Sequence, residues 1–403
     1  MSMAEERPRL RVALNASFWG QETVGSGQYL HHLVEALVRL DEAPEVLLCG
    51  APEWRGGRPL PSGVAWHDVP VSLWRRLGPN LEKVWFEQVA YPQAARRTAA
   101  MVAHVPYFAS PLAPTRPTVV TVHDLIPLLL PAYRGSAAVR GYGRLVALAA
   151  RRADLVLTDA EAARKDIIRH LGIPSARVRA IPLATGSAYR PVEDAETLKD
   201  VRARYALPAQ YLLYLGGFDQ RRNLGTLFRA LALARQRDPD LPPLALAGVL
   251  PASDSVLTPD PRRLAAEAGV AEGVRFLGRV AEEDKPALYS AARAFVFPSR
   301  YEGFGLTVLE ALACGTPVIA ADATSLPEVG GPGALLVGPD DVDGWAAALV
   351  RLANDDALRA GLRAAGLAHA ARFSWQRTAR ETLAAYRQVL GEAQRSDALR
   401  GEV

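Results

Sequence analysis

The sequence predicts an α/β protein with two domains, each built around a parallel sheet. Short apolar runs alternate with helical stretches along the chain, a pattern typical of parallel strands joined by crossover helices. A chain of 403 residues is also too long for one ordinary hydrophobic core. An irregular stretch, IPLATGSAYRPVEDAE at 181–196, separates two runs of the alternation, and we expect the domain boundary near residues 186–198.

The first domain is expected to begin with an apolar strand at 11–15 (RVALN) and a helix at 27–40 (GQYLHHLVEALVRL). The helix has one apolar face, because leucine or valine recurs at every third or fourth position. Later strands are expected at 45–50, 118–122 and 153–158, with a helix at 161–172 that ends at Gly172 before Pro174.

The second domain repeats the alternation, and a final helix is expected at 373–390. We place the domains at 1–190 and 191–375, and we expect residues 376–403 to form a C-terminal helix that packs back on the first domain. The strands of the second domain are expected at 211–217, 241–248, 273–278, 294–299, 316–322 and 334–338, and its helices at 223–237, 284–293 and 306–315.

Composition excludes several classes of protein. The formal net charge of +4 is a small excess over many compensating charges, so we expect no nucleic-acid partner. Cys49 and Cys314 lie far apart in apolar contexts, which favours buried free thiols over a disulfide or a metal site. The N-terminus lacks the apolar run of a signal peptide, and no segment approaches the ~20 apolar residues of a membrane helix. These features predict a soluble, cytoplasmic protein.

The stretch RYEGFGLTVLEALAC, which starts at Arg300, carries two glutamates eight positions apart. It follows an expected strand, so it lies at the carboxyl end of the sheet, where α/β proteins bind ligands. Gly303 and Gly305 let the backbone approach a ligand, and the helix start beyond them favours a phosphate. Glu302 would lie near that phosphate, while Glu310 could accept hydrogen bonds from two ribose hydroxyls. The spacing by itself leaves open that both are surface acids.

This constellation resembles the E-x7-E motif of the retaining glycosyltransferases of family 4. Members of that family have the GT-B fold, in which two Rossmann-like domains face each other across a cleft. The resemblance runs over nearly the whole chain, in an ordered series of motifs. The series comprises GSGQYLHHLVEAL, TVHDLIPLLLP, VLTDAEAARKDIIRHLG, YLLYLGGFDQRRNLGTLFRAL and FLGRVAEEDKPALYSAARAFVFPSRYEGFGLTVLEALACGTPVIAAD.

The resemblance implies roles for residues of the first domain. Gly25 and Gly27 match the family's glycine loop near the donor diphosphate, although a plain helix-entry turn would also explain them. His123, at the end of PTVVTVH, matches a histidine that lies beside the transferred sugar. Asp124 could orient that imidazole or cap the next segment.

The segment GGFDQRRN departs from the family pattern. The family commonly has an arginine directly after the glycine and a lysine several residues later, both on the donor phosphates. Here the first position is Gly217, so that arginine is missing, and the second is Arg222, which keeps the charge and adds bidentate geometry. Arg221 is either its helper or an exposed neighbour. Val280 matches a position whose backbone contacts the nucleotide base.

The implied reaction breaks a sugar–diphosphate bond, and the negative charge on the departing diphosphate must be stabilised. Arg222 would stabilise this leaving group, and the acceptor hydroxyl would attack on the front face. Glu302 would position the sugar and stabilise positive charge at the anomeric carbon, and Glu310 would hold the ribose. The backbone amides expected to help belong to Gly303, Phe304, Gly305 and Leu306.

We expect no metal and no cofactor. The D-x-D pattern within DDVDG at 340–344 follows the last strand and precedes a helical run, so helix capping explains it. The donor is expected to be a nucleotide sugar. The GGFDQRRN and HDLIPL segments look most like those of bacterial mannosyltransferases of polysaccharide assembly, which makes GDP-mannose the first expectation and a UDP-hexose the second.

The signals for the acceptor are weaker. His104 and Tyr107, in AHVPYF, follow a further expected strand and are candidate acceptor-pocket residues. The segment 71–97 mixes tryptophan and phenylalanine with arginine and lysine. It could pack its aromatics inward, or rest on an anionic membrane near a lipid-linked acceptor. A saccharide or a lipid-linked acceptor, and a peripheral position at the inner face of the membrane, both stay open.

Three other functions were weighed. A nucleotide-sugar epimerase shares the architecture, but its ordered motifs are not found. A nicotinamide oxidoreductase would need the G-x-G-x-x-G fingerprint, which is not evident here. Gly217 keeps open a catalytically silent nucleotide-sugar-binding subunit, while Glu302, Glu310, His123 and Arg222 argue against one.

Overall fold

The computed structural model of the protein describes residues 9–21, 24–57, 59–70 and 78–401. The chain divides into two compact units. The main boundary lies at 183/184, where the sequence suggested 190/191, and residues 130–133 also belong to the second unit. The first unit contains residues 1–129, 134–183 and 375–403, and the second contains residues 130–133 and 184–374.

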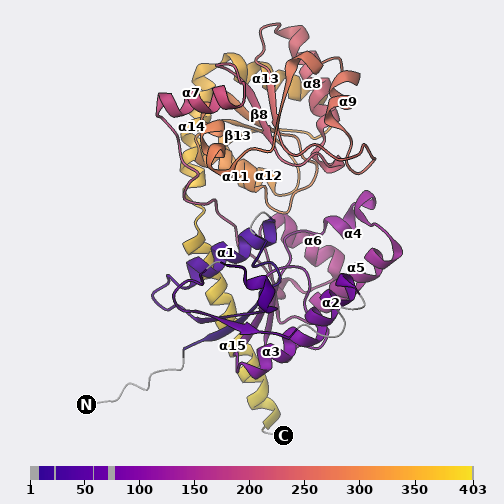
Figure 1. Cartoon of the computed structure of the whole chain (residues 1–403), viewed down its shortest axis with the longest axis vertical. Helices are drawn as coiled ribbons and strands as arrows, with labels where there is room; N and C mark the ends of the chain where they lie inside the picture. Colours follow the sequence, from indigo (N-terminus) through magenta and orange to yellow (C-terminus); the bar gives the residue numbers. More distant parts are fainter. Residues whose placement is uncertain (1–8, 22–23, 58, 71–77, 402–403) are drawn as a thin grey trace, which may run out of the picture. The chain divides into compact units, whose positions relative to one another are not determined.

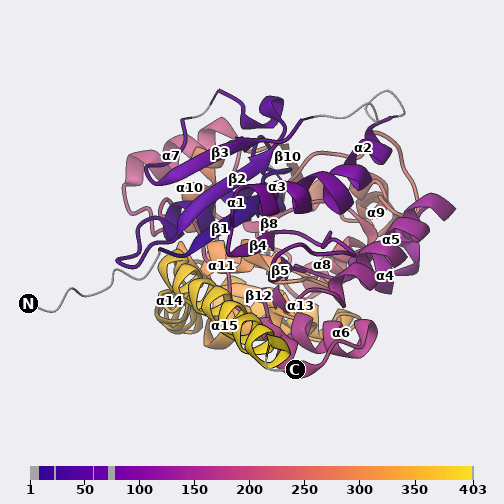
Figure 2. The same cartoon turned by 90° about the horizontal axis from the view of Figure 1, so that it is seen from below.

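The first unit is built on a parallel sheet that has seven strands within the described ranges, in the order β3-β2-β1-β4-β5-β6-β7. Figure 2 shows β3, β2 and β1 next to one another. The inner strands are almost wholly buried because they are runs of valine, leucine and alanine. The strands are β1 (Arg11–Asn15), β2 (Glu45–Gly50), β3 (Val64–Asp68), β4 (Val102–Val105), β5 (Thr118–Thr121), β6 (Leu155–Thr158) and β7 (Val178–Ala180).

Two long helices of this unit, α1 (Gly25–Leu37) and α15 (Trp375–Gly401), contact each other. The leucine and valine stripe of α1 is buried in one hydrophobic core with Tyr386 of α15, so the C-terminal helix is part of the first unit. The remaining helices are α2 (Pro79–Trp85), the π-helix η3 (Phe86–Ala90), α3 (Tyr91–Arg97), α4 (Ile126–Leu129), α5 (Ala137–Ala150) and α6 (Glu161–Leu171), with short 3-10 turns η1 (Pro52–Arg55) and η5 (Ser175–Arg177).

The second unit, all of whose residues are described, contains a six-stranded parallel sheet in the order β10-β9-β8-β11-β12-β13. The order reverses between β8 and β11, and ligands of α/β sheets bind at such a point, beyond the carboxyl ends of the strands. The strands are β8 (Leu212–Leu215), β9 (Leu244–Ala247), β10 (Val274–Gly278), β11 (Ala294–Phe297), β12 (Val318–Ala321) and β13 (Ala334–Val337).

The helices of the second unit form two contacting groups. In one group α8 packs between α9 and α13 (Figure 1), and in the other α11 contacts both α10 and α14. The bounds are α7 (Ala195–Arg204), α8 (Leu224–Arg237), α9 (Pro261–Glu267), α10 (Lys285–Ala291), α11 (Leu306–Ala313), α12 (Leu326–Gly330), α13 (Val342–Asn354) and α14 (Asp356–Ala370), with 3-10 turns η4 (Pro131–Tyr133), η6 (Gln220–Arg222), η7 (Ala271–Gly273), η8 (Glu282–Asp284) and η9 (Gly331–Gly333).

The six strands predicted for the second unit are all present. In the first unit, β3 and β7 were not predicted, because β3 (VAWHD) is half-exposed and polar and β7 has only three residues. His104 lies inside β4, where the sequence suggested that it follows a strand. Cys49 and Cys314 are free and buried, as expected.

Candidate functional site

The connection from β8 to α8 places two arginines at the carboxyl end of the second sheet. Strand β8 ends at Leu215, and the 3-10 turn η6 then carries Arg221 and Arg222. The turn ends at Asn223, whose φ of 59° is left-handed. Its side-chain amide donates to the backbone oxygens of Pro298 (3.2 Å) and Pro339 (2.7 Å), so this loop is tied to the loop that follows β11.

Both arginines reach the first glutamate of the E-x7-E motif. Arg221 Nη1 donates to Glu302 Oε1 at 2.7 Å, and Arg222 Nη1 donates to the same oxygen. Asp219 lies on the other edge of both guanidinium groups, 3.1 Å from Arg221 Nε and 3.5 Å from Arg222 Nε. We call Asp219, Arg221, Arg222 and Glu302 the arginine cluster; their side chains are between 11% and 20% exposed.

The backbone and hydroxyls around Glu302 hold it in place. Ser299 Oγ donates to Glu302 Oε1 at 2.6 Å, and the Glu302 amide donates to Thr324 Oγ1 at 3.0 Å. Ser325 Oγ donates to the Glu302 backbone oxygen at 3.1 Å. Two guanidinium groups therefore converge on one carboxylate oxygen in a fixed loop, an arrangement that also suits a phosphate oxygen.

Gly217 is exposed and lies beside the arginine cluster. A Cβ atom at this position would meet Asp219 Oδ2 at 3.4 Å, an ordinary contact, so the backbone leaves room for a side chain. Arg222 also lies over the ring of Phe297, 5.2 Å from its centre, which adds a cation–π contact to its support.

The second glutamate of the motif is buried. Helix α11 begins after Gly305, whose φ of 106° only glycine adopts easily, and Gly303 and Phe304 are buried beside it, while Leu306 is half-buried. Glu310 is 7% exposed and accepts a hydrogen bond of 2.9 Å from the Tyr289 hydroxyl. The alternative that Glu310 decorates a surface is therefore wrong.

Burial controls the ionisation of Glu310. It raises the pKa of Glu310 to about 7, against the opposing effects of Lys285 and of the Tyr289 hydrogen bond. Tyr189 lies on the same side, with its ring centre 6.3 Å from that of Tyr289. Val280, expected near the base, is buried in the connection that follows β10.

In the first unit, His123 follows β5 and is paired with Asp159, which follows β6. His123 Nδ1 lies 2.8 Å from Asp159 Oδ2, and the Tyr29 ring packs edge-on at 4.8 Å. Burial lowers the pKa of His123, but the charge and hydrogen bond of Asp159, together with Asp124, outweigh it, and the net pKa is raised. His123 Nε2 makes no hydrogen bond of good geometry in the described part of the chain, although the Pro106 backbone also interacts with the imidazole and helps to raise its pKa. This nitrogen is the one that can face a ligand.

The two glycines of the first loop differ. A Cβ atom on Gly27 would lie 2.0 Å from the Gln21 backbone oxygen, so a close turn of the chain requires this glycine. Gly25, at the start of α1, is exposed, and a Cβ atom there would meet no described atom within 4 Å. A close backbone contact therefore explains the glycine at position 27, and no such contact explains Gly25.

His104 and Tyr107, the two residues expected in an acceptor pocket, make hydrogen bonds to other residues of the first unit. His104 is fully buried, with Nδ1 2.7 Å from the Tyr386 hydroxyl and Nε2 2.8 Å from Thr121 Oγ1. Tyr107 is buried, and its hydroxyl lies 3.2 Å from Ser17 Oγ and donates to Glu87 at 3.1 Å. These contacts favour structural roles for both.

The aromatic and basic segment 71–97 is described only from residue 78. Within it, Phe86 is buried and Trp85 packs against the hydrophobic core of the first unit, which favours the inward-packing alternative. Residues 71–77, with Trp74, Arg75 and Arg76, lie outside the described residues. No helix in the described ranges combines the length and apolar character that a membrane span requires.

The D-x-D pattern caps a helix, as expected. Asp341 Oδ1 accepts a hydrogen bond of 2.9 Å from the Gly344 amide at the start of α13. Asp343 pairs with Arg237, and Asp340 pairs with Arg300. Within the described ranges, no three histidine, cysteine or acidic residues group as metal ligands.

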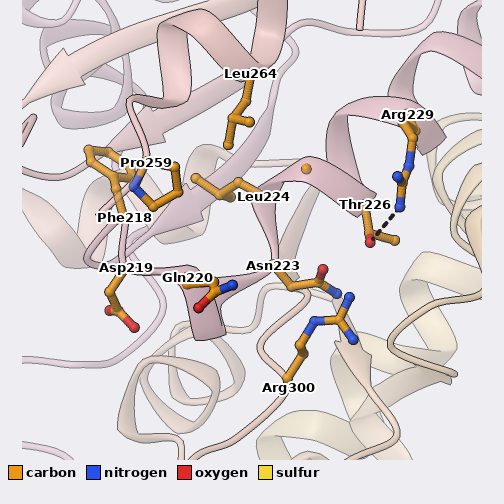
Figure 3. A pocket seen from close by; sticks show the side chains of 11 residues that line it. Phe218, Asp219, Gln220, Asn223, Leu224, Thr226, Arg229, Pro259, Leu264 and Arg300 are labelled. Atoms are coloured by element: carbon orange, nitrogen blue, oxygen red, sulfur yellow. Dashed lines mark hydrogen bonds between the residues drawn. The ribbon is translucent and has the colours of Figure 1, made fainter. Parts of the chain in front are cut away.

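A separate pocket of about 260 Å³ lies on the outer side of η6. Figure 3 shows apolar side chains, among them Leu224 and Leu264, on one side, and Asn223, Thr226 and Arg229 on the other. Asp219 lies at its edge and is shared with the arginine cluster (Figure 3).

Several residues of the site were not singled out from the sequence. Asp219 stands inside the quoted GGFDQRRN and could have been noticed as an acid between two glycines and two arginines. Asp159 and Tyr289 carry no local signal, since each is defined by a partner on a different strand or helix. Ser299 and Thr324 hold Glu302 and are likewise visible only in the structure.

Two family models match this chain. Residues 24–185 match the model described as Glycosyltransferase Family 4, and residues 209–355 match the model described as Glycosyl transferases group 1. The O-antigen chain mannosyltransferase B of Escherichia coli is 39% identical over 271 residues, which are 67% of this chain and 70% of that protein. The serotype-specific mannosyltransferase WbdA of Escherichia coli is 32% identical over 290 residues, or 71% of this chain, but the match spans only 35% of WbdA.

A solved structure with a similar fold is the sucrose-phosphate synthase of Thermosynechococcus elongatus. Its TM-score is 0.71 at 24% identity, with 95% of this chain and 100% of that chain covered. At this identity the likeness concerns the fold, two units with parallel sheets of the GT-B type.

Proposed function

Because this chain belongs to glycosyltransferase family 4, we propose that it is a retaining, metal-independent hexosyltransferase that takes mannose from a nucleotide-diphosphate sugar. The observation that carries the proposal is the convergence of Arg221 and Arg222 on one oxygen of Glu302. It brings two cations and the first glutamate of the motif together from two connected loops at the carboxyl end of the sheet.

The arginine cluster would stabilise the leaving diphosphate. The bond between the anomeric carbon and the β-phosphate oxygen breaks, and the acceptor oxygen bonds the same face of that carbon. The acceptor proton passes to the departing phosphate oxygen. Arg221 and Arg222 compensate the charge that develops on the diphosphate. Glu302 then needs another partner, and its carboxylate is available to stabilise positive charge at the anomeric carbon.

Glu310 would hold the ribose of the nucleotide. Its carboxyl group accepts a hydrogen bond from Tyr289 at 2.9 Å and also interacts with the Tyr189 hydroxyl, and it can accept further hydrogen bonds from two adjacent ribose hydroxyls. Such bonds favour the ionised carboxylate over the protonated form. In the first unit, His123 would contact the transferred sugar through Nε2, and Asp159 would keep the imidazole in the required orientation.

The choice of mannose is supported by the similarity to two mannosyltransferases of Escherichia coli, and GDP-mannose is the first choice of donor. A UDP-hexose is the second choice. The acceptor would be a saccharide, free or lipid-linked, at a non-reducing hydroxyl group.

A transfer assay tests the proposal. Purified protein is incubated with GDP-mannose or UDP-hexoses and a mannose oligosaccharide, in EDTA or in magnesium. We expect mannosyl transfer in EDTA, with the donor's anomeric configuration kept in the product by NMR, and loss of transfer in Arg222→Ala. Inversion of the configuration would contradict retention, and activity only in magnesium would contradict metal independence.

A nucleotide-sugar-binding subunit without activity is the second candidate, because Gly217 leaves the cluster with no cation beyond Arg221 and Arg222 nearby in the loop. The change in melting temperature on addition of GDP or UDP shows whether the protein binds a nucleotide, as both candidate functions require. A ligand at ~100 times its Kd stabilises the protein by ~2.7 kcal/mol. A shift with GDP or UDP but no turnover with any acceptor would favour the binding subunit.

A further inference from the structure

Arg221 and Arg222 are consecutive and carry like charges, yet their Nη1 atoms meet at one oxygen. Two free arginine side chains on a turn of three residues would separate, because like charges repel and each side chain has many rotamers. Glu302 attracts both, but a donor diphosphate must take over those same Nη atoms. Something other than Glu302 must therefore keep the two guanidinium groups together when the diphosphate is bound.

Asp219 is in the position to do this. Its Oδ1 lies 3.1 Å from Arg221 Nε, and its Oδ2 lies 3.5 Å from Arg222 Nε. The carboxylate is thus ion-paired with the Nε edge of both guanidinium groups, closely at Arg221 and without a hydrogen bond at Arg222 Nε, and the Nη1 atoms of both are directed at Glu302. A ligand that replaces Glu302 would meet two guanidinium groups already fixed in direction, which reduces the entropy lost on binding.

Tyr133 holds Asp219 in turn. Its hydroxyl donates to Asp219 Oδ1, and the Arg221 backbone amide approaches the same hydroxyl at 3.4 Å. Tyr133 belongs to residues 130–133, the short segment that lies in the second unit although Leu129 and Arg134 on either side belong to the first. The orientation of Asp219 therefore depends on a segment that is 86 or more positions away in the sequence.

We propose that Asp219, held by Tyr133, is a positioning residue that presents Arg221 and Arg222 to the diphosphate of the donor. The proposal rests on the proposed function, because it assumes that this cluster takes a diphosphate. Asp219 and Tyr133 act through the arginines and do not touch the reacting atoms.

The charge of Asp219 allows a decisive test. If Asp219 only neutralised the arginines, Asp219→Asn would add one positive charge to the cluster and tighten the binding of an anion. If Asp219 positions them, the same change weakens binding. We expect Asp219→Asn to weaken the binding of inorganic pyrophosphate roughly ten-fold, measured by calorimetry, a loss between that of an exposed and that of a buried ion pair. Tighter binding would overturn the proposal.

Tyr133→Phe provides a second variant that alters no charge. We expect it to weaken pyrophosphate binding several-fold and to raise the KM of the donor more than it lowers kcat. The matched control is Tyr205→Phe, since Tyr205 donates to Asp284 at 2.7 Å and accepts from the Ala281 amide at 3.3 Å, while Asp284 pairs with Arg204. This triad repeats the geometry of Tyr133 elsewhere in the unit.

The control variant should unfold at a similar temperature to Tyr133→Phe and bind pyrophosphate like the wild-type protein. An equal loss in both variants would overturn the positioning role, because it would reflect general loosening of the unit. If the wild-type protein bound pyrophosphate, lost it in Asp219→Asn, and yet transferred no sugar, the positioning role would stand and the transferase function would fail. If the wild-type protein did not bind pyrophosphate, the positioning role would fail, and the transfer assay would decide separately whether the protein is a transferase.

Discussion

Glu310 accepts a hydrogen bond of 2.9 Å from the hydroxyl of Tyr289, and both side chains are buried in the second unit. A carboxyl group in such a place loses its hydration, and only part of the loss is made up by the nearby Lys285 and the hydroxyls of Tyr289 and Tyr189. The protein thus keeps an acid whose hydrogen-bonding capacity is not filled by its own chain. This acid is the one that the motif assigns to the ribose.

Glu310 should make stability depend on pH in a defined direction. Its pKa is raised from 4.5 to about 7, so between these values the folded protein holds a proton that the unfolded chain releases. The contribution to stability is complete below about pH 4.5 and is lost as the pH rises through 7. We expect Glu310→Gln to flatten the fall of the melting temperature between pH 5 and pH 7. A curve parallel to that of the wild-type protein would contradict the buried, proton-holding Glu310.

A second buried glutamate, Glu87 in the first unit, should also affect the melting temperature between pH 5 and pH 7, so its variant serves as a control. It accepts hydrogen bonds from Tyr142 at 2.9 Å and Tyr107 at 3.1 Å, and burial raises its pKa to about 7 as well. Glu87→Gln should therefore flatten the same pH range of the stability curve. It should leave nucleotide binding unchanged, and this difference separates the two glutamates.

Nucleotide affinity should rise with pH until Glu310 is ionised. A carboxylate accepts hydrogen bonds from ribose hydroxyls better than a carboxylic acid does, so affinity for GDP or UDP should increase up to about pH 7 and then level off. Glu310→Ala should weaken binding about ten- to hundred-fold, the effect of losing hydrogen bonds to a charged group. Calorimetry with the ribose and the 2′-deoxyribose nucleotide completes a cycle. If the wild-type protein and Glu310→Ala discriminated equally between the ribose and the 2′-deoxyribose nucleotide, Glu310 would not contact the ribose.

The sequence predicted much of the second unit because its signals are local. Strands such as AFVF and VIAA are short apolar runs, and the E-x7-E spacing places Glu302 in a loop and Glu310 in a helix by counting alone. The burial of Glu310 could not be predicted, because it depends on Tyr289 from a neighbouring helix.

The first unit was harder to predict, for a physical reason. The half-exposed β3 has no apolar run, and His104 in β4 looks like a ligand residue until Tyr386, 282 positions away, is seen bonded to it. The segment 130–133 gives no sign in the sequence that it belongs to the second unit. These features depend on contacts between residues far apart in the sequence, so they cannot be predicted from a pattern within a short stretch of it.

Asp159 should control the ionisation of His123. Asp159→Asn removes the charge that raises the pKa of His123, so the pKa should fall, as read from the imidazole proton resonances. A raised histidine pKa stabilises the protein fully below the ordinary value of 6.5 and ceases to do so as the pH rises through the folded value. The variant should lose this contribution. If His123 only packed against Tyr29, kcat would be unchanged; we expect it to fall while the KM of the nucleotide donor stays close to that of the wild-type protein.

Gly217→Arg should strengthen diphosphate binding. The position is exposed, and its Cβ atom would have only an ordinary contact of 3.4 Å with Asp219, so the backbone can accept the side chain. A new cation beside the cluster should tighten pyrophosphate binding about two- to five-fold at low salt, the size of an exposed charge pair, and the gain should shrink as salt is added. Gly361→Arg is the matched control, since it adds the same charge at an exposed position of α14 where a Cβ atom meets nothing described within 4 Å.

The direction of the change in Gly217→Arg distinguishes two states of the cluster. Tighter binding than in Gly361→Arg would mean that a diphosphate lies within reach of residue 217 and that Asp219 still holds Arg221. Weaker binding would mean that the new guanidinium group draws Asp219 away from Arg221, which lies 3.1 Å from it, and so releases an arginine that the diphosphate needs. Equal binding in the two variants would place the diphosphate away from this loop and would contradict the assignment of the arginine cluster to the leaving group.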